Sequence, residues 1–189
     1  MLASVAAMAI IIFEGVDRAG KTSVALELSR KTGIPYFKGA PLQPITRKDF
    51  CELVFRDYAT ITHMLEVLNC DIIIDRFLGS EYAYSFLRSN TNTKLLFELD
   101  KKLASLDATN VLCLCNEYDL MKRWKNTSET GYNFEMNNKL NDRFHEFVEL
   151  SKCNALVLDT ALPINFNVNE LLKQLNLKNK FNGCTNYGK

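Results

Sequence analysis

One stretch near the N-terminus has the residue types and the spacing needed to bind phosphate groups. Residues Gly15–Thr22 read G-V-D-R-A-G-K-T, which fits the pattern G-x-x-x-x-G-K-[ST] without a gap. Glycines let successive backbone N–H groups turn toward an anion, and a helix after the loop adds its positive dipole end. Lys21 can then reach the β- and γ-phosphates of ATP, and the Thr22 hydroxyl can ligate Mg²⁺. We therefore predict a phosphate-binding loop (P-loop) that uses ATP and Mg²⁺.

A second candidate pair, Asp75 and Arg76, follows the apolar run at 71–75, D-I-I-I-D. An acid at the end of an apolar strand is the usual partner of a P-loop, where it holds Mg²⁺ or its water. The planar guanidinium of Arg76 suits a phosphate. The structural alternative is that Asp75 caps the next turn and pairs with Arg76. The P-loop elsewhere in the chain favours the functional interpretation.

Further cations lie where phosphoryl transfer could use them. Arg18 lies inside the loop, so we expect its guanidinium beside the transferred group, as an arginine finger supplied in cis; the alternative is a solvated loop charge. Lys122, Arg123 and Lys125 precede a polar segment, 126–133, that could close over ATP as a lid. The alternative for this cluster is a solvated cationic helix face.

These residues need a scaffold, and the hydropathy pattern predicts one. Continuous apolar runs alternate with segments of helical periodicity, which indicates a parallel sheet covered by helices on both faces. The predicted fold class is α/β, a parallel sheet flanked by helices like that of P-loop nucleotide kinases. Ligands of such sheets bind beyond the carboxyl ends of the strands, where the candidate residues fall. The predicted strands are 9–14, 35–37, 71–75, 110–115 and 155–159, and the predicted helices are 20–32, 48–68, 79–87, 93–106, 119–125, 139–150 and 168–175.

Length, charge and cysteine content limit the class of protein. The 189 residues suffice for one domain with a real core, so we expect a single domain over 1–189. A net charge of +1 argues against nucleic acid or a membrane surface as partners. The six cysteines form no C-x-x-C pair, which favours reduced thiols in a cytoplasmic protein over disulfides or zinc. Cys113 and Cys115 are expected on one face of a strand, as small buried hydrophobes.

The two ends of the chain are expected to lie outside the core. Residues 1–13 are almost wholly apolar, but they lack a basic region and run straight into the glycine loop, so we expect no signal peptide. The run is also too short to span a bilayer. Met8 is an alternative start, which would make residues 1–7 an appendage. The polar tail from 178 to 189 is expected to be flexible.

Two segments resemble the signature motifs of the thymidylate kinase family. The segment IIFEGVDRAGKTS is similar to the family's opening Phe-Glu-Gly-x-Asp-x-x-Gly-Lys-[Ser/Thr]. The segment DRFLGSEYAY is similar to the second signature, Asp-Arg-Tyr-x-x-Ser-x-x-Ala-[Tyr/Phe]. The resemblance implies ATP-dependent transfer to a deoxynucleoside monophosphate, with dTMP as the acceptor. It also implies small-molecule nucleotide partners and a homodimer.

The resemblance further implies roles for individual residues. Asp17 would approach the 3′-hydroxyl of the acceptor sugar, Asp75 would be the Mg²⁺-linked or proton-accepting carboxylate, and Arg76 would bind phosphates. The expected catalytic residues are Lys21, Arg18, Asp75 and Arg76, and the expected metal ligands are Thr22 and Asp75. The expected ATP contacts are Gly15, Val16, Asp17, Arg18, Ala19, Gly20, Lys21, Thr22, Arg123 and Thr160. The expected acceptor contacts are Asp17, Lys38, Arg56, Arg76, Ser80 and Tyr84.

The sequence departs from the family pattern at two places that bear on the acceptor. Phe77 stands where the second signature has Tyr, and Lys38 stands near the place of the arginine in the family's Arg-Glu-Pro-Gly. An ammonium is a point charge and a poorer match for a phosphate than a guanidinium. Two alternatives stay open: a deoxynucleoside kinase, and a nucleotide-binding module without catalysis. The first usually has Glu-Arg-Ser after its third strand, where this chain has Asp-Arg-Phe.

Overall fold

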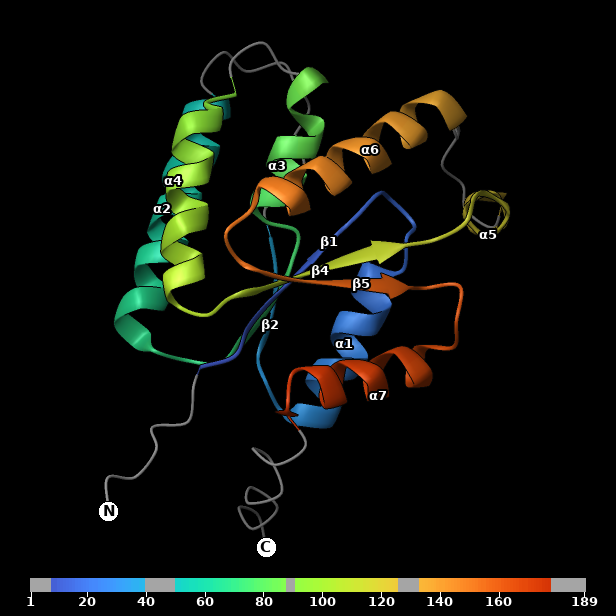
Figure 1. Ribbon diagram of the computed structural model, residues 1–189, viewed down its shortest axis with the longest axis horizontal. Helices are drawn as coiled ribbons and strands as arrows, with labels where there is room; N and C mark the ends of the chain where they lie inside the picture. Colours follow the sequence, from blue (N-terminus) through green and yellow to red (C-terminus); the bar gives the residue numbers. More distant parts are fainter. Residues whose placement is uncertain (1–7, 40–49, 88–90, 126–132, 178–189) are drawn as a thin grey trace, which may run out of the picture.

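Five parallel strands form one sheet in the order β2-β3-β1-β4-β5 (Figure 1). The computed structural model describes residues 8–39, 50–87, 91–125 and 133–177, with only the backbone of 50–54. The expected appendage at 1–7, most of the expected lid (126–132) and the tail at 178–189 lie outside these residues. The strands are β1 (Ile10–Glu14), β2 (Tyr36–Lys38), β3 (Ile72–Asp75), β4 (Thr109–Leu114) and β5 (Asn154–Asp159).

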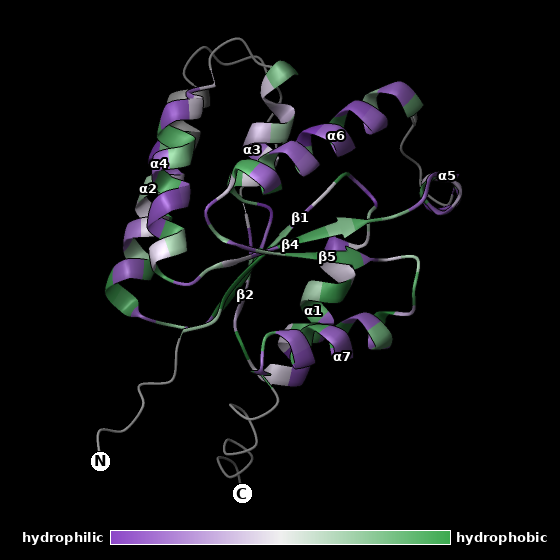
Figure 2. Cartoon of the chain, viewed as in Figure 1, coloured by the Kyte–Doolittle hydropathy of each residue, from purple (hydrophilic) through white to green (hydrophobic). Residues whose placement is uncertain are grey.

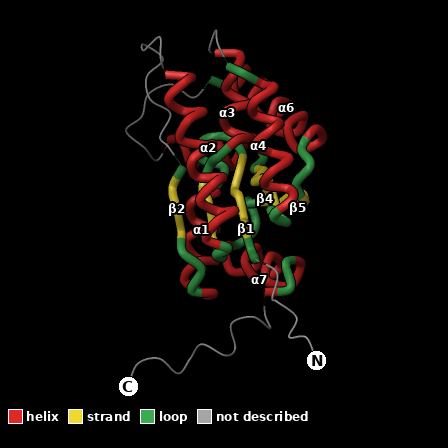
Figure 3. The backbone as a smooth tube through the Cα atoms, turned by 90° about the vertical axis from the view of Figure 1, so that its left-hand side faces the viewer, coloured by secondary structure: helices red, strands yellow, loops and turns green. Residues whose placement is uncertain are grey.

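Helices lie on both sides of this sheet, which confirms the predicted fold class. Two helices, α1 and α7, pack together on one side, and α2, α3, α4 and α6 lie together on the other (Figures 1 and 3). The helices are α1 (Lys21–Thr32), α2 (Phe50–Leu68), α3 (Leu78–Ala83), α4 (Thr93–Ser105), α5 (Glu117–Lys125), α6 (Phe134–Leu150) and α7 (Ile164–Gln174), with a 3₁₀ turn at Tyr84–Leu87. In the described part of the chain, no helix combines the length and apolar character needed to cross a membrane.

The central strand β1 explains how the core is divided between the two sides. All five of its residues are buried, and successive side chains of a strand point to opposite faces. Ile11 and Phe13 pack with the α1 and α7 side, whereas Ile10 and Ile12 pack with α2 and α4. The apolar strands and the mixed surfaces of the helices are visible in Figure 2. Burial on both faces accounts for the unbroken apolar run in the sequence.

The edge strand β5 differs from the prediction that both faces of the sheet are covered. Val157 is 58% exposed, and Ala155 is exposed as well. Leu158, whose side chain points to the other face, is buried in the core with α1 and α7. The helices of the described chain therefore cover β5 on one face only.

Helices α6 and α7 begin a full turn or more earlier than predicted, whereas α3 and α5 begin within two residues of the prediction. Helix α6 begins at Phe134, because the Asn133 side chain accepts a hydrogen bond from the Met136 backbone N–H and caps the first turn. Helix α7 begins at Ile164, directly after a proline. Its first turn carries exposed Ile164 and Phe166, which do not follow the buried apolar stripe used to predict its start.

The topology brings the two motif regions together. Strands β1 and β3 are paired neighbours, with Phe13 opposite Asp75. The P-loop follows β1, and Arg76 follows β3, so both motifs leave the same edge of the sheet side by side. This is the edge where parallel sheets bind ligands.

Candidate active site

The P-loop connects β1 to α1 by a tight turn with unusual backbone angles. Gly15 has φ of 138° and Gly20 has φ of 87°, a region that side chains rarely tolerate. A Cβ at Gly15 would lie 2.4 Å from the main-chain oxygen of Cys113, so no other residue fits there. Arg18 also has positive φ, 65°. The loop is therefore shaped by its glycines and by the backbone of β4 beneath it.

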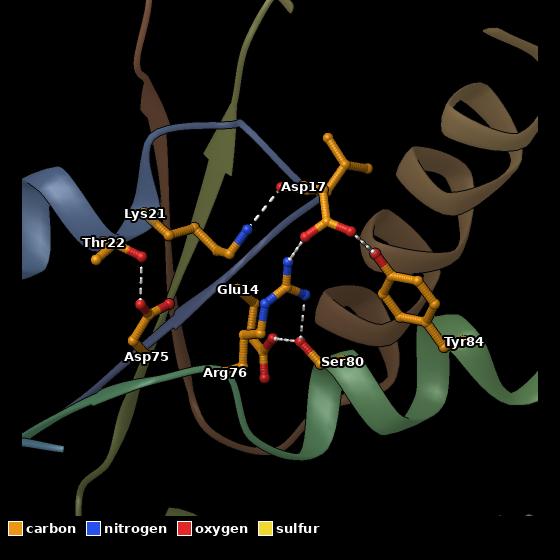
Figure 4. Close-up of polar contacts among 9 residues, drawn as sticks. Glu14, Asp17, Lys21, Thr22, Asp75, Arg76, Ser80 and Tyr84 are labelled. Carbon is orange, nitrogen blue, oxygen red and sulfur yellow. Dashed lines mark hydrogen bonds and ion pairs between the residues drawn. The ribbon is translucent and has the colours of Figure 1, made fainter. Parts of the chain in front are cut away.

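The Lys21 side chain folds back over the loop. Its Nζ donates a hydrogen bond of 2.6 Å to the Val16 carbonyl, and the residue is buried (Figure 4). Burial lowers the pKa of Lys21 to about 8, and the charge of Arg76 adds to this effect, while nearby carboxylates oppose it. A buried ammonium with a single carbonyl partner is well placed to bind phosphate oxygens.

Asp75 and Thr22 face each other at the carboxyl end of β3. The Thr22 hydroxyl donates to Asp75 Oδ2 at 2.5 Å, and the Tyr36 hydroxyl donates to the same oxygen at 2.9 Å. The other oxygen, Oδ1, is buried and has no hydrogen-bond partner among the described residues. A buried carboxylate oxygen without a partner, beside a hydroxyl, is the chemistry of a Mg²⁺ site, so these residues fit the metal. Neither signature motif pointed to Tyr36.

Asp17 and Arg76 form an ion pair across the mouth of the loop (Figure 4). The Tyr84 hydroxyl donates to the other carboxylate oxygen of Asp17 at 3.1 Å, and its ring lies 5.9 Å from the Arg76 guanidinium. Burial acts to lower the pKa of Arg76, but the charge of Asp17 and the interactions with Tyr84 and Glu14 outweigh it, so the pKa is raised. Burial raises the pKa of Tyr84 to about 12. Arg76 thus stays charged and Tyr84 stays a hydrogen-bond donor.

A fully buried carboxylate, Glu14, holds the turn that follows Arg76. It accepts hydrogen bonds from the Phe77 backbone N–H at 2.8 Å and from the Ser80 hydroxyl at 2.6 Å. Burial raises the pKa of Glu14 despite these bonds and the charge of Arg76. Ser80, expected to border the acceptor pocket, is itself buried and lies 3.4 Å from an Arg76 nitrogen. Ser80 therefore lies between Glu14 and Arg76 and is not among the described residues that line the cavity.

Helix α5 holds the loop from the opposite side. Arg123 donates one hydrogen bond to the Arg18 carbonyl, at 3.0 Å, and another to the Thr160 carbonyl, at 2.6 Å. The guanidinium of Arg18 lies 5.4 Å from the centre of the Trp124 ring, a cation–π distance. The Thr160 hydroxyl lies within hydrogen-bonding distance of the Ala19 and Leu114 carbonyls. Sequence reasoning assigned Arg123 and Thr160 to ATP; both line the cavity beside the P-loop, and these hydrogen bonds are with backbone carbonyls.

A cavity of about 700 Å³ opens between these groups. Its described lining carries five cations and two carboxylates, a net charge of +3. Lys38 lines it, whereas Arg56 is exposed on α2 and does not. Residues 40–49, which connect β2 to α2, lie outside the described chain. The charged lining residues are Arg18, Lys21, Lys38, Arg76, Arg123, Asp17 and Asp75.

Comparison with known proteins identifies the fold. No family sequence model and no curated protein matches the chain. Among solved structures, it is similar to YorR of Bacillus subtilis in complex with phosphorylated GDP, with 19% identity, a TM-score of 0.74 and coverage of 90% of this chain and 98% of that one. The chain has the fold of the P-loop nucleotide kinases.

Two enzymes of known activity share this fold with lower similarity. Deoxyadenosine kinase from M. mycoides, with products dCMP and dCDP bound, aligns with 18% identity and a TM-score of 0.58, over 89% of this chain and 99% of that one. Thymidylate kinase from Candida albicans aligns with 17% identity and a TM-score of 0.58, over 89% and 91%. One acts on a nucleoside and the other on a nucleotide, so the fold leaves the acceptor undecided.

Proposed function

We propose that this protein transfers the γ-phosphoryl group of ATP to the 5′-phosphate of a deoxynucleoside monophosphate, with dTMP as the preferred acceptor. The observation that carries the proposal is one cavity in which the P-loop, the Asp75 carboxylate and the Asp17–Arg76 pair meet. These groups come from two segments that are far apart in the chain, residues 15–22 and residues 75–76, and residues of both line the cavity.

The donor side of the proposal depends on the loop. ATP phosphates would lie against the backbone N–H groups of Gly15–Thr22 and the N-terminus of α1. Lys21 would exchange the Val16 carbonyl for phosphate oxygens, a stronger charge-assisted contact. Thr22 and Asp75 would hold Mg²⁺, which when bound neutralises phosphate charge. Arg18, on the cavity wall, would stabilise the charge that develops on the transferred group.

The acceptor side depends on Asp17, Arg76 and Tyr84. Both oxygens of the Asp17 carboxylate already have a partner, Arg76 on one and Tyr84 on the other. The side chain is still partly exposed at the cavity, where it could accept a further hydrogen bond from a sugar hydroxyl. Arg76 and Lys38 supply positive charge on the same cavity wall. A net charge of +3 suits a lining that receives both a magnesium–triphosphate and a monophosphate. A nucleoside acceptor would bring no charge of its own.

A coupled assay of ADP formation over a panel of nucleosides and monophosphates tests the proposal. We expect ADP formation to increase most with dTMP. Stimulation by nucleosides alone would establish a deoxynucleoside kinase instead, and ATP binding without turnover would establish a non-catalytic binding module.

Two loop variants test the mechanism. Lys21→Ala should abolish turnover and leave the fold intact by circular dichroism, whereas Lys122→Ala, an exposed lysine on α5, should leave activity unchanged. Arg18→Ala should lower kcat far more than ATP affinity, because a transition-state contact is lost. A change in KM with an unchanged kcat would contradict the finger role.

A further inference from the structure

Tyr36 lies in β2, outside both signature motifs, yet it contacts the carboxylate expected to bind metal. In the parallel register, Tyr36 pairs with Ile73 and Lys38 pairs with Asp75. Tyr36 and Asp75 are therefore diagonal neighbours on one face of the sheet, within reach of a long side chain. The Tyr36 hydroxyl donates to Asp75 Oδ2 at 2.9 Å. Among the described residues that line the cavity, Asp75 is present and Tyr36 is not.

The two oxygens of Asp75 are used differently. Oδ2 accepts hydrogen bonds from both Thr22, at 2.5 Å, and Tyr36, at 2.9 Å. Oδ1 is buried and finds no partner within the described chain. A carboxylate is planar, so fixing Oδ2 also fixes the direction of Oδ1. Because both hydroxyls bind Oδ2, the lone pairs of Oδ1 stay available to a cation or to a water bound to it.

Metal binding would involve Thr22 directly, but not Tyr36. The Thr22 hydroxyl would ligate Mg²⁺ through its oxygen while its proton can still be donated to Asp75, so its geometry would be shared between two partners. The Tyr36 hydroxyl does not line the cavity, so it would hold Oδ2 without contacting the metal. Partners of this kind, which contact a metal ligand rather than the metal, commonly contribute 10- to 100-fold to metal affinity.

We propose that Tyr36 is a positioning residue for the magnesium site: its hydroxyl holds Asp75 Oδ2 so that Oδ1 faces the metal. This inference rests on the proposed function, because the metal arrives with ATP. It assigns a role in metal binding to β2, a strand whose expected contribution was the acceptor-side Lys38.

Tyr36→Phe tests the role with little disturbance of packing. The Tyr36 ring is partly buried against the core, and Phe keeps it while removing the hydroxyl. Calorimetry would measure ATP affinity once in EDTA and once in excess Mg²⁺, and electron paramagnetic resonance would measure Mn²⁺ binding in the presence of ADP. We expect ATP affinity in EDTA to stay within about twofold of wild type, and Mn²⁺ affinity to fall about tenfold. Phe37→Leu, at an exposed position on the same strand, is the matched control and should change neither value.

The outcomes separate the inference from the function. If wild-type protein binds neither Mg-ATP nor Mn-ADP, the proposed function fails, and the inference fails with it. If wild type binds both and Tyr36→Phe binds Mn²⁺ equally well, only the inference is overturned. Equal weakening of ATP affinity with and without metal would also overturn it, because that result indicates a general structural role. A selective loss of metal affinity supports it.

Discussion

The guanidinium of Arg123 on α5 donates a hydrogen bond to the main-chain carbonyl of Arg18 inside the P-loop, at 3.0 Å. Its second nitrogen donates to the Thr160 carbonyl, at 2.6 Å, at the start of the connection from β5 to α7. One side chain therefore joins the loop, the end of the sheet and α5. This fixes the backbone of Arg18, whose positive φ needs such support.

Arg123→Ala should weaken ATP binding because it loosens the loop. Hydrogen bonds from a charged donor contribute about 1.5–3 kcal/mol, so we expect the Kd for ATP to rise by about tenfold. Arg123→Lys, which cannot span both carbonyls, should give an intermediate value. Calorimetry with a non-hydrolysable ATP analogue measures the change.

The exposed neighbour Lys122 provides the control for Arg123. Lys122→Ala should leave the Kd for ATP at the wild-type value, because the side chain is solvated. If Arg123→Ala instead reduced kcat and left ATP affinity unaltered, the support role would be wrong, and Arg123 would have to contact the reacting phosphates.

A double-mutant cycle between Asp17 and Arg76 should reveal a strong coupling in catalysis and a weak one in stability. Asp17→Asn and Arg76→Gln should each lower kcat/KM for the acceptor by about 100-fold, with little change in ATP affinity. The double variant should be far less impaired than the product of the two effects. The side chain of Asp17 is 51% exposed, so solvent screening limits the coupling in the free energy of unfolding to about 1 kcal/mol or less. Fully additive losses in kcat/KM would contradict a shared role.

Gly79→Ala should destabilise the fold, because the added methyl group has no space. An ideal Cβ at Gly79 would lie 2.9 Å from side-chain carbons of both Glu14 and Phe147. Overpacking of this kind costs about 1–3 kcal/mol, measurable by urea denaturation. Because Glu14 supports the turn that carries Arg76, activity should also fall.

Gly33→Ala is the control for Gly79→Ala, because it introduces backbone strain without steric crowding. Gly33 ends α1 with φ of 73°, and no described atom lies within 4 Å of a Cβ built there. Substitution should cost about 1 kcal/mol through the backbone angle and leave activity unaltered. Equal losses of activity in the two glycine variants would disprove the link between Gly79 and the site.

Buried thiols should resist alkylation in the native protein. Burial raises the pKa of both Cys113 and Cys153 to about 12, well above the usual value for a thiol. The reactive thiolate therefore forms in quantity only as the pH approaches 12, and reaction at pH 8 requires local opening. Iodoacetamide pulses followed by mass spectrometry should label Cys70, which is partly exposed, before either of them. Labelling of Cys113 as fast as Cys70 at pH 8 would contradict the buried environment.

The sequence by itself determined the features that depend on neighbouring residues in the chain. The apolar run of β1 and the stop signal at Gly33 were readable because burial and positive φ leave local traces. The loop Gly15–Thr22 was readable because its chemistry lies within eight successive positions. The burial of Cys113 and Cys115 was predicted from their alternating places in a local apolar run, and it is confirmed.

Only the tertiary structure decided which distant side chains share one atom or one carbonyl. Tyr36 reaches Asp75 Oδ2 through the register of β2 and β3, and Thr22 reaches the same oxygen from the first turn of α1; no local pattern records either contact. Nor does any local pattern show that Arg56 is exposed on α2 and does not line the cavity. Apolar runs and glycines in the sequence indicate where strands and turns lie, but contacts across the sheet depend on how strands and helices pack. That packing is set by the whole core and by no single segment.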